Sequence, residues 1–159
     1  MVTGTGEQPA ARVLQPRRPD AEFVIHLGTS PTSRKAADIR LTGRATLVYT
    51  DYRRGAGVTV YAAAGLLNDP TTRRDQFLPI WRSFWPTGPD DRAFVVVRCV
   101  PTAIEVWDAS RGITPAPFGL AGARIELLDH GWNLVARPAV GTTPSDSSED
   151  EGGQPATRL

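Results

Sequence analysis

The stretch EFVIHLGTSPTSRKAADIRL, Glu22 to Leu41, joins a strand-like run to a helix-like run and decides the local fold of the chain. Its first part, Glu22–Gly28, alternates imperfectly and is rich in β-branched and aromatic residues, which is typical of a strand. Its second part, Ser30–Leu41, begins with a serine that can cap a helix and a proline suited to a first helical position. The stretch therefore predicts a strand, a loop and a short helix capped by Ser30.

Strand signals dominate the rest of the chain on both sides of this stretch. The segment Pro70–Trp85 carries aromatic residues at helical spacing and predicts one or two amphipathic helices. The connections are short, so most strands should be antiparallel. Together, the predicted strands and helices indicate a mainly β fold, a β-barrel of six to eight strands with peripheral helices. The other predicted strands are Ala10–Gln15, Arg44–Asp51, Val58–Leu67, a pair at Ala93–Val100 and Thr102–Asp108 around Pro101, and a last hairpin of Arg124–Asp129 and Trp132–Arg137.

Length and composition bound the class of protein. The chain has 159 residues and a formal net charge of +1, which describes one globular domain and argues against a nucleic-acid partner. Cys99 is the single cysteine, which excludes a disulfide framework and fits a cytoplasmic protein. No apolar run approaches the roughly 20 residues of a membrane span. We expect residues 1–8 to be a frayed remnant of a first strand, 9–140 to form the domain, and 141–159 to be a disordered acidic tail.

The turn between the predicted strand and helix is the strongest candidate site. Between Gly28 and Lys35 it gathers several hydroxyl side chains, an arginine and the only lysine of the chain. The free N–H groups and dipole at a helix N-terminus favour an anion, and two cations would add to this. The pattern predicts a phosphate site. The alternative is an ordinary capped helix whose two cations are solvated.

Other chemistry-bearing residues have ordinary structural interpretations. Arg12 and Gln15 lie three apart, so on a regular strand they would point to opposite faces, each as a surface residue. His26 and His130 have no ligand partners at metal-binding spacing, so we expect no metal site. Cys99 is expected to be a small buried apolar residue. The aromatic residues Phe77, Trp81, Phe84 and Trp85, together with Trp107, are expected in the core or at a subunit interface rather than on a base-stacking surface.

Five segments together resemble the pyridoxamine 5'-phosphate oxidase-like FMN-binding split-barrel family, especially its general-stress-protein-26-like branch. They are ARVLQP at Ala11–Pro16, FVIHLGTSPTSRKAADIR at Phe23–Arg40, RATLVYTD from Arg44, FWPTGPDD at Phe84–Asp91 and PTAIEVWD at Pro101–Asp108. The resemblance implies a homodimer of six-stranded antiparallel split barrels with FMN bound at the dimer interface. The chain begins as though inside the family's first strand, so we expect a barrel shortened at its N-terminus.

The resemblance also assigns residues to the cofactor. It implies that Ser33, Arg34 and Lys35 hold the FMN phosphate and that Thr29 and Ser30 line the phosphate and ribityl side. It further places Arg12 and Gln15 close to the flavin and Trp107 near the dimer interface.

The function implied by this resemblance is that of a flavin-dependent oxidoreductase acting on a small-molecule substrate or electron donor. The flavin would perform the redox step, so no catalytic side chain is assigned. The chain shows no element resembling the substrate-binding C-terminus of authentic pyridoxamine 5'-phosphate oxidases, and we do not expect that activity. The alternatives are an F420-dependent or haem-associated split-barrel protein, or a non-catalytic module that binds flavin or serves as a cofactor-free dimeric interaction protein.

Overall fold

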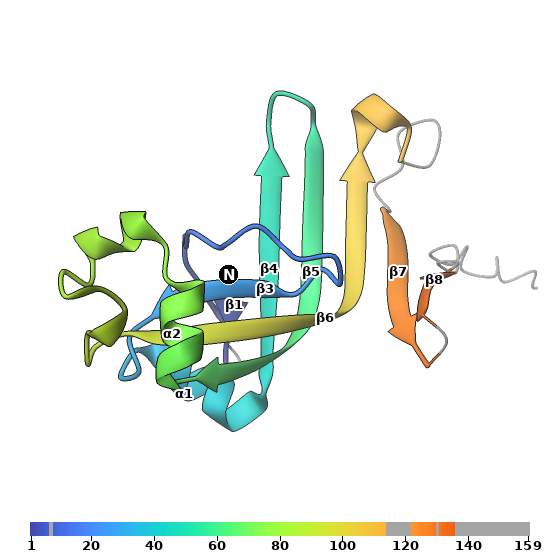
Figure 1. Cartoon of the computed structure of the whole chain (residues 1–159). Helices are drawn as coiled ribbons and strands as arrows, with labels where there is room; N and C mark the ends of the chain where they lie inside the picture. The colour runs from blue at the N-terminus through green and yellow to red at the C-terminus, as the bar shows by residue number, and fades with distance from the viewer. Residues whose placement is uncertain (7, 114–121, 130, 136–159) are drawn as a thin grey trace, which may run out of the picture.

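The computed structural model describes residues 1–6, 8–113, 122–129 and 131–135, and these form a mainly antiparallel β structure with two α-helices (Figure 1). This confirms the predicted mainly β class. The helices are α1 (Arg34–Thr42) and α2 (Pro70–Gln76), and short 3-10 turns span η1 (Pro79–Ser83), η2 (Gly88–Asp90) and η3 (Ala109–Arg111). The strands are β1 (Val2–Thr3), β2 (Ala10–Ala11), β3 (Ile25–Thr29), β4 (Arg44–Asp51), β5 (Ala56–Leu67), β6 (Val95–Asp108), β7 (Ala123–Leu128) and β8 (Gly131–Val135).

The strands pair in the order β2-β1-β4-β5-β6-β7-β8, and β3 pairs with the first half of β6. The segment after β2 leads the chain back to β3, because Pro16 bridges Leu27 and the Arg17 amide donates to the His26 carbonyl. The strand pairings thus run from β3 through β6, β5, β4 and β1 to β2, and the segment after β2 returns to β3 at Pro16 and Arg17, in a six-stranded split-barrel arrangement. The β7–β8 hairpin extends from the second half of β6.

The region 93–108 corrects one sequence-based prediction. The expected pair of strands around Pro101 is a single 14-residue strand, β6, which pairs along its length with β5. Pro101 lacks an N–H donor, and the register of the β5–β6 ladder shifts opposite it, between Tyr61 and Ala62. The proline therefore lies at an irregularity of the ladder rather than at a chain reversal, and β6 as a whole is a curved strand (Figure 1).

The start of α1 corrects a second prediction. Ser33, not Ser30, is the N-cap, and its hydroxyl accepts from the Ala36 amide. Ser30 instead forms a tight turn, in which its carbonyl accepts from the Ser33 amide and its hydroxyl accepts from the Thr32 amide. The helix therefore begins at Arg34, three residues later than the predicted first helical residue Pro31. Because of this shift, Lys35 is the second residue of the helix and lies in its first turn.

Two apolar clusters hold the fold together. The larger one fills the barrel and is built from β3, β4, β5, β6 and the inner face of α1, with Ile39 and Cys99 fully enclosed. The smaller cluster lies between the start of β6 and the α2–η2 region, with Trp81, Phe94 and Val96 at its centre. The prediction that Cys99 is a buried apolar residue is confirmed, and burial raises the pKa of its thiol to about 12.

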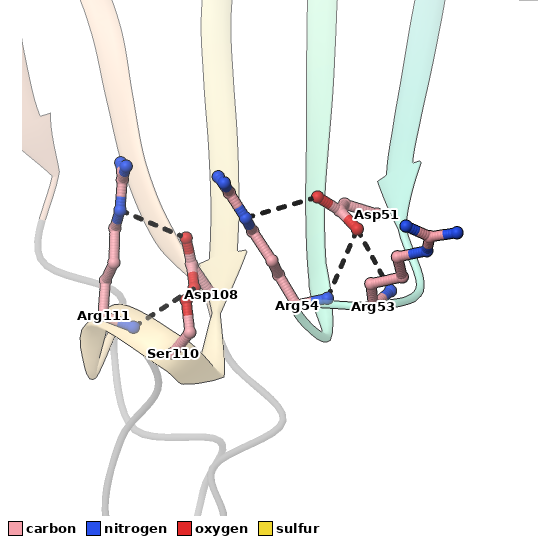
Figure 2. A network of polar contacts seen from close by, with 6 residues as sticks. All are labelled: Asp51, Arg53, Arg54, Asp108, Ser110 and Arg111. Carbon is pink, nitrogen blue, oxygen red and sulfur yellow. Dashed lines mark hydrogen bonds and ion pairs between the residues drawn. The ribbon is translucent and has the colours of Figure 1, made fainter.

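The turns at the far end of the β4, β5 and β6 strands are fastened by two aspartates (Figure 2). The Asp51 carboxylate accepts from the amides of Arg53 and Arg54 at the β4–β5 hairpin. Asp108 does the same for η3, where it accepts from the Arg111 amide and the Ser110 hydroxyl. Each aspartate also lies within 4 Å of one of these arginine side chains. This network closes the end of the sheet opposite α1.

Some predictions concern residues 1–8 and the C-terminal part of the chain. Residues Val2 and Thr3 of the first segment form β1, which pairs with β2 and with Thr46 of β4. The acidic segment 141–159, part of the loop after Ser110, His130 and the end of the last predicted strand lie outside the described residues. The sequence-based predictions for these residues therefore remain predictions. Among the described residues, no helix combines the length and the apolar character that a bilayer crossing requires.

Candidate functional site

A pocket of about 470 Å³ lies where β3 ends and α1 begins, within the range of about 300–1,000 Å³ that small-molecule sites occupy. One wall comes from the segment after β2, with Val13, Leu14 and Gln15; the second comes from Gly28, Thr29, Ser30 and Lys35; the third comes from Trp81, Phe84 and Trp85 of the η1 region. The pocket thus combines an aromatic side with a polar, cationic corner.

Lys35 supplies the charge in this corner. Its side chain is half-buried, and it forms no ion pair or hydrogen bond among the described residues. Burial lowers the pKa of its ammonium group, and the positive charge of Arg12 lowers this pKa further. A cation that is partly desolvated and has no acidic partner gains most from an anionic ligand.

The hydroxyl groups beside Lys35 are arranged by local hydrogen bonds. Thr29 is buried at the end of β3, and its hydroxyl lies 3.1 Å from that of Ser33. Ser33 caps α1 by accepting from the Ala36 amide, and it does not line the pocket. Ser30 lines the pocket, and its hydroxyl lies 3.0 Å from that of Thr32. The turn therefore places hydroxyl groups and the start of a helix around one point.

The remaining expected cofactor residues lie elsewhere in the described structure. Arg34 is exposed, and its guanidinium donates to the Gln8 carbonyl at 3.3 Å. Arg12 does not line this pocket; it borders a neighbouring one with Val13 and Leu14. Trp107 lies near the far end of β6, beside Gly55. The structure thus brings together Gln15, Thr29, Ser30 and Lys35, with Ser33 directly behind them.

The aromatic wall was expected only as core or interface. Trp81 is buried and packs edge-on against Phe77, and the Trp85 indole N–H donates to the Ala93 carbonyl at 2.8 Å. Of the two expected places, the core does not hold Phe84, which is 71% exposed and borders the pocket. Trp107 also lies apart from the cluster. Helical spacing found these residues, but spacing could not show which faces pack inward.

One chain of side-chain hydrogen bonds, which begins at the residue before the pocket-lining Val13, could not be predicted from the sequence. Arg12 donates from its NH1 group to the Thr3 hydroxyl at 2.7 Å, and the Thr3 hydroxyl donates to the Asp38 carboxylate at 2.7 Å. The three residues belong to the segment after β2, to β1 and to α1. Nothing in their sequence separation could have indicated this contact, because only the barrel brings the segments together.

The structure offers no support for metal chemistry or a histidine base at this site. Among the described residues, no cluster of three or more His, Cys, Asp or Glu side chains could hold a metal ion. His26 lies on β3 opposite Arg98, and burial, followed by the charge of Arg98, lowers its pKa. It does not line the pocket, so the candidate site consists of one cation, hydroxyls, a helix start and aromatic rings.

Comparison with known proteins gives the class of this chain. The family model described as "Pyridoxamine 5'-phosphate oxidase like" matches residues 1–127, which is most of the sequence. The chain therefore belongs to the pyridoxamine 5'-phosphate oxidase-like family, and the resemblance drawn from its motifs is confirmed. A search of curated protein sequences gives no match.

Solved structures share this fold. A general-stress-protein-26-related protein from Clostridium acetobutylicum is 17% identical, with a TM-score of 0.62 over 69% of this chain and 79% of that one. A pyridoxamine 5'-phosphate oxidase-related, FMN-binding protein from Nostoc punctiforme is 16% identical, with a TM-score of 0.62 over 87% and 85%. PhzG from Burkholderia lata, solved with tetrahydrophenazine-1-carboxylic acid, is 21% identical, with a TM-score of 0.61 over 86% and 80%.

Proposed function

We propose that this protein binds FMN in the pocket between the end of β3, the start of α1 and the η1 region. The observation that carries the proposal is Lys35, a half-buried cation with no ion-pair partner among the described residues, at the first turn of a helix and beside an aromatic wall. A phosphate group fits the cationic corner, and a flat ring system fits the apolar side. The family and the FMN-binding relative from Nostoc punctiforme support this choice of cofactor.

In this proposal each part of the site has a separate role. Lys35 and the amides at the start of α1 hold the phosphate, and Ser33 keeps that helix end in place. Thr29 and Ser30 lie toward the phosphate and ribityl side, and Gln15 faces the ring. Arg12 and Arg34 contribute positive charge from the edges of the site, and Trp107 is assigned to the dimer interface by resemblance alone.

The activity we infer is a flavin-dependent oxidation or reduction of a small molecule. The isoalloxazine ring supplies the redox chemistry when it is bound, and the chain supplies anchoring, ring orientation and exclusion of water. No catalytic acid or base is assigned. A cytoplasmic location is a further prediction, consistent with the free thiol of Cys99.

The protein should act as a homodimer. Val13 is 98% exposed at the junction of two pockets, the one that contains Lys35 and a second one bordered by Val48 and Tyr49. Val48 and Phe84 are also exposed beside these pockets. Exposed apolar side chains gathered around two pockets that share Val13 are best explained by a partner subunit, which would also enclose the cofactor.

The test is a flavin titration of the purified protein followed by flavin fluorescence. Lys35→Met should weaken FMN binding at least about tenfold, because a charge-assisted contact is lost, and should change riboflavin binding little. Arg53→Met, which removes a cation from the opposite end of the sheet, is the matched control and should bind FMN like the wild type.

Unchanged FMN affinity in Lys35→Met would refute the assignment of the phosphate site. The visible spectrum and mass of any chromophore that copurifies separate FMN from F420 and haem. Reduction of the bound flavin by NADH or NADPH, followed by a turnover assay, separates an enzyme from a non-catalytic flavin carrier.

A further inference from the structure

The polar chain Arg12–Thr3–Asp38 links two segments that border the proposed phosphate site: Arg12 directly precedes the pocket-lining residue Val13, and Asp38 lies on α1 three residues after Lys35. Thr3 is 4% exposed and Asp38 is 6% exposed, so both polar side chains are buried. The Thr3 hydroxyl receives one hydrogen bond, from Arg12, and donates one, to Asp38, each at 2.7 Å. A hydroxyl can do both at once, whereas a valine side chain of the same shape can do neither.

The direction of the hydrogen bonds in this chain is fixed. Arginine can only donate and an ionised carboxylate can only accept, so the Thr3 hydroxyl must lie between them as acceptor and donor. The bridge therefore joins a cation to an anion without direct contact between them. It also ties three separate segments together: β1, the segment after β2, and α1.

The position of Asp38 on α1 gives the bridge a further consequence. Asp38 is the single acidic residue of the helix and lies three residues after Lys35, a spacing at which the two side chains could pair across one turn. Its carboxylate instead accepts from Thr3, and no ion pair joins it to Lys35. Lys35 is left without a counter-ion and is available to a ligand anion.

Arg12 directly precedes Val13, Leu14 and Gln15, which form one wall of the pocket that contains Lys35. Its positive charge contributes to the lowered pKa of Lys35, which indicates that the two cations share one electrostatic environment. Two like charges near each other are unfavourable in the free protein, and a bound dianion relieves this repulsion. The guanidinium has five N–H donors, of which one is used by Thr3.

We propose that Thr3 is a positioning residue of the phosphate site: by bridging Arg12 to Asp38 it holds the Arg12 guanidinium beside Lys35 and keeps Asp38 from pairing with Lys35. Thr3 itself does not touch the ligand. Both cations then act on one phosphate group. This inference rests on the proposed FMN site and adds a residue from the first strand to it.

The experiment compares affinities for FMN and riboflavin, which differ only by the phosphate group. In the full-length protein, Thr3→Val should lower the ratio of FMN to riboflavin affinity about fivefold, since Arg12 loses its anchor and Asp38 becomes free to pair with Lys35. Thr3→Ser keeps the hydroxyl and should restore the ratio to within about twofold of the wild type. A merely structural defect would weaken both flavins equally.

Arg12→Met is the second variant and decides the question even if Thr3→Val fails to fold, because Arg12 is only half-buried. It should also lower the ratio, and an unchanged ratio in Arg12→Met overturns the inference. An unchanged ratio of FMN to riboflavin affinity in a folded Thr3→Val protein also overturns the inference.

Lys35→Met separates this inference from the proposed function. If Lys35→Met keeps the full preference for FMN, the phosphate site itself is wrong and the inference falls with it. If Lys35→Met loses the preference while Thr3→Val and Arg12→Met retain it, the site stands and the positioning role of Thr3 is wrong.

Discussion

At the scale of single residues, Lys35 offers a direct chemical measurement because it is the only lysine of the chain. Burial, and then the charge of Arg12, lowers its pKa from the model-compound value of 10.5. An amine reacts with acylating reagents only when it is deprotonated, so a lowered pKa leaves more reactive amine at a given pH below that value.

We therefore predict that the acylation rate of Lys35 reaches half its maximum at a pH below 10.5. Adding FMN should move this midpoint upward, because a phosphate favours the charged ammonium form, and should also slow the reaction. The measurement is the rate of modification of the peptide containing Lys35, followed by mass spectrometry over a pH series. A midpoint that is unaffected by FMN would place the phosphate away from Lys35.

Gly28 provides a second test at this scale. A Cβ atom added there would lie 2.9 Å from Phe94 and 2.9 Å from Trp85, and 3.1 Å from Trp81. These rings pack against one another, so they cannot move aside without disturbing the smaller apolar cluster. The glycine therefore permits the close contact between β3 and the aromatic wall of the pocket.

Gly28→Ala should lower the free energy of unfolding by about 1–3 kcal/mol, the usual cost of overpacking. Gly65→Ala, on β5, is the matched control because nothing lies within 4 Å of its added Cβ, and it should not destabilise the protein. Urea denaturation measures both. Equal stability of the two variants would show that the aromatic cluster can yield at Gly28.

At the scale of secondary-structure elements, the first turn of α1 serves both stability and the proposed site. Ser33 caps the helix through the Ala36 amide, and Lys35 follows two residues later. An aspartate can cap a helix as well as a serine can, but it adds a negative charge. The two roles of this turn can therefore be separated by substitution at one position.

Ser33→Ala should cost about 1 kcal/mol of stability through loss of the cap. Ser33→Asp should retain the stability of the wild type and yet weaken FMN binding several-fold, because its carboxylate repels the phosphate and competes for Lys35. Thermal unfolding and flavin titration report the two effects. Full FMN affinity in Ser33→Asp would mean that the phosphate does not approach this helix end.

A comparison of predicted and observed strand bounds shows which features sequence patterns predict correctly. The range Arg44–Asp51 was predicted with the bounds that β4 has, because its residue types favour a strand and a turn follows it. The predicted strand Ala10–Gln15 was too long, since regular pairing ends at Ala11. Proline disfavours ladder pairing locally, so the sequence predicts a strand boundary at Pro101, but pairing with β5 and burial keep β6 continuous.

At the scale of the whole molecule, the proposed dimer can be tested through the apolar surface around Val13. Val13→Glu should convert a dimer to a monomer. Val13 is exposed in the single chain, and in the proposed dimer the glutamate would place an unpaired charge inside the interface. FMN affinity should fall with it if the partner encloses the cofactor. Light scattering coupled to size-exclusion chromatography measures the mass.

Leu41→Glu is the control for this experiment. Leu41 is 77% exposed in the last turn of α1 and does not border either pocket, so its substitution should leave the mass and the FMN affinity unchanged. A wild-type protein that elutes as a monomer with full FMN affinity would contradict the dimer proposal.

The sequence by itself determined the family, the mainly β class and the presence of a helix start between Gly28 and Lys35, though not which serine caps it, because these depend on residue types and spacings within short segments. Only the tertiary structure decided that Lys35 and not Arg34 lines the pocket, that Phe84 is exposed beside it, and that Thr3 joins Arg12 to Asp38. The physical reason is that these outcomes depend on which distant segments the barrel brings into contact. Local propensity carries no information about that choice.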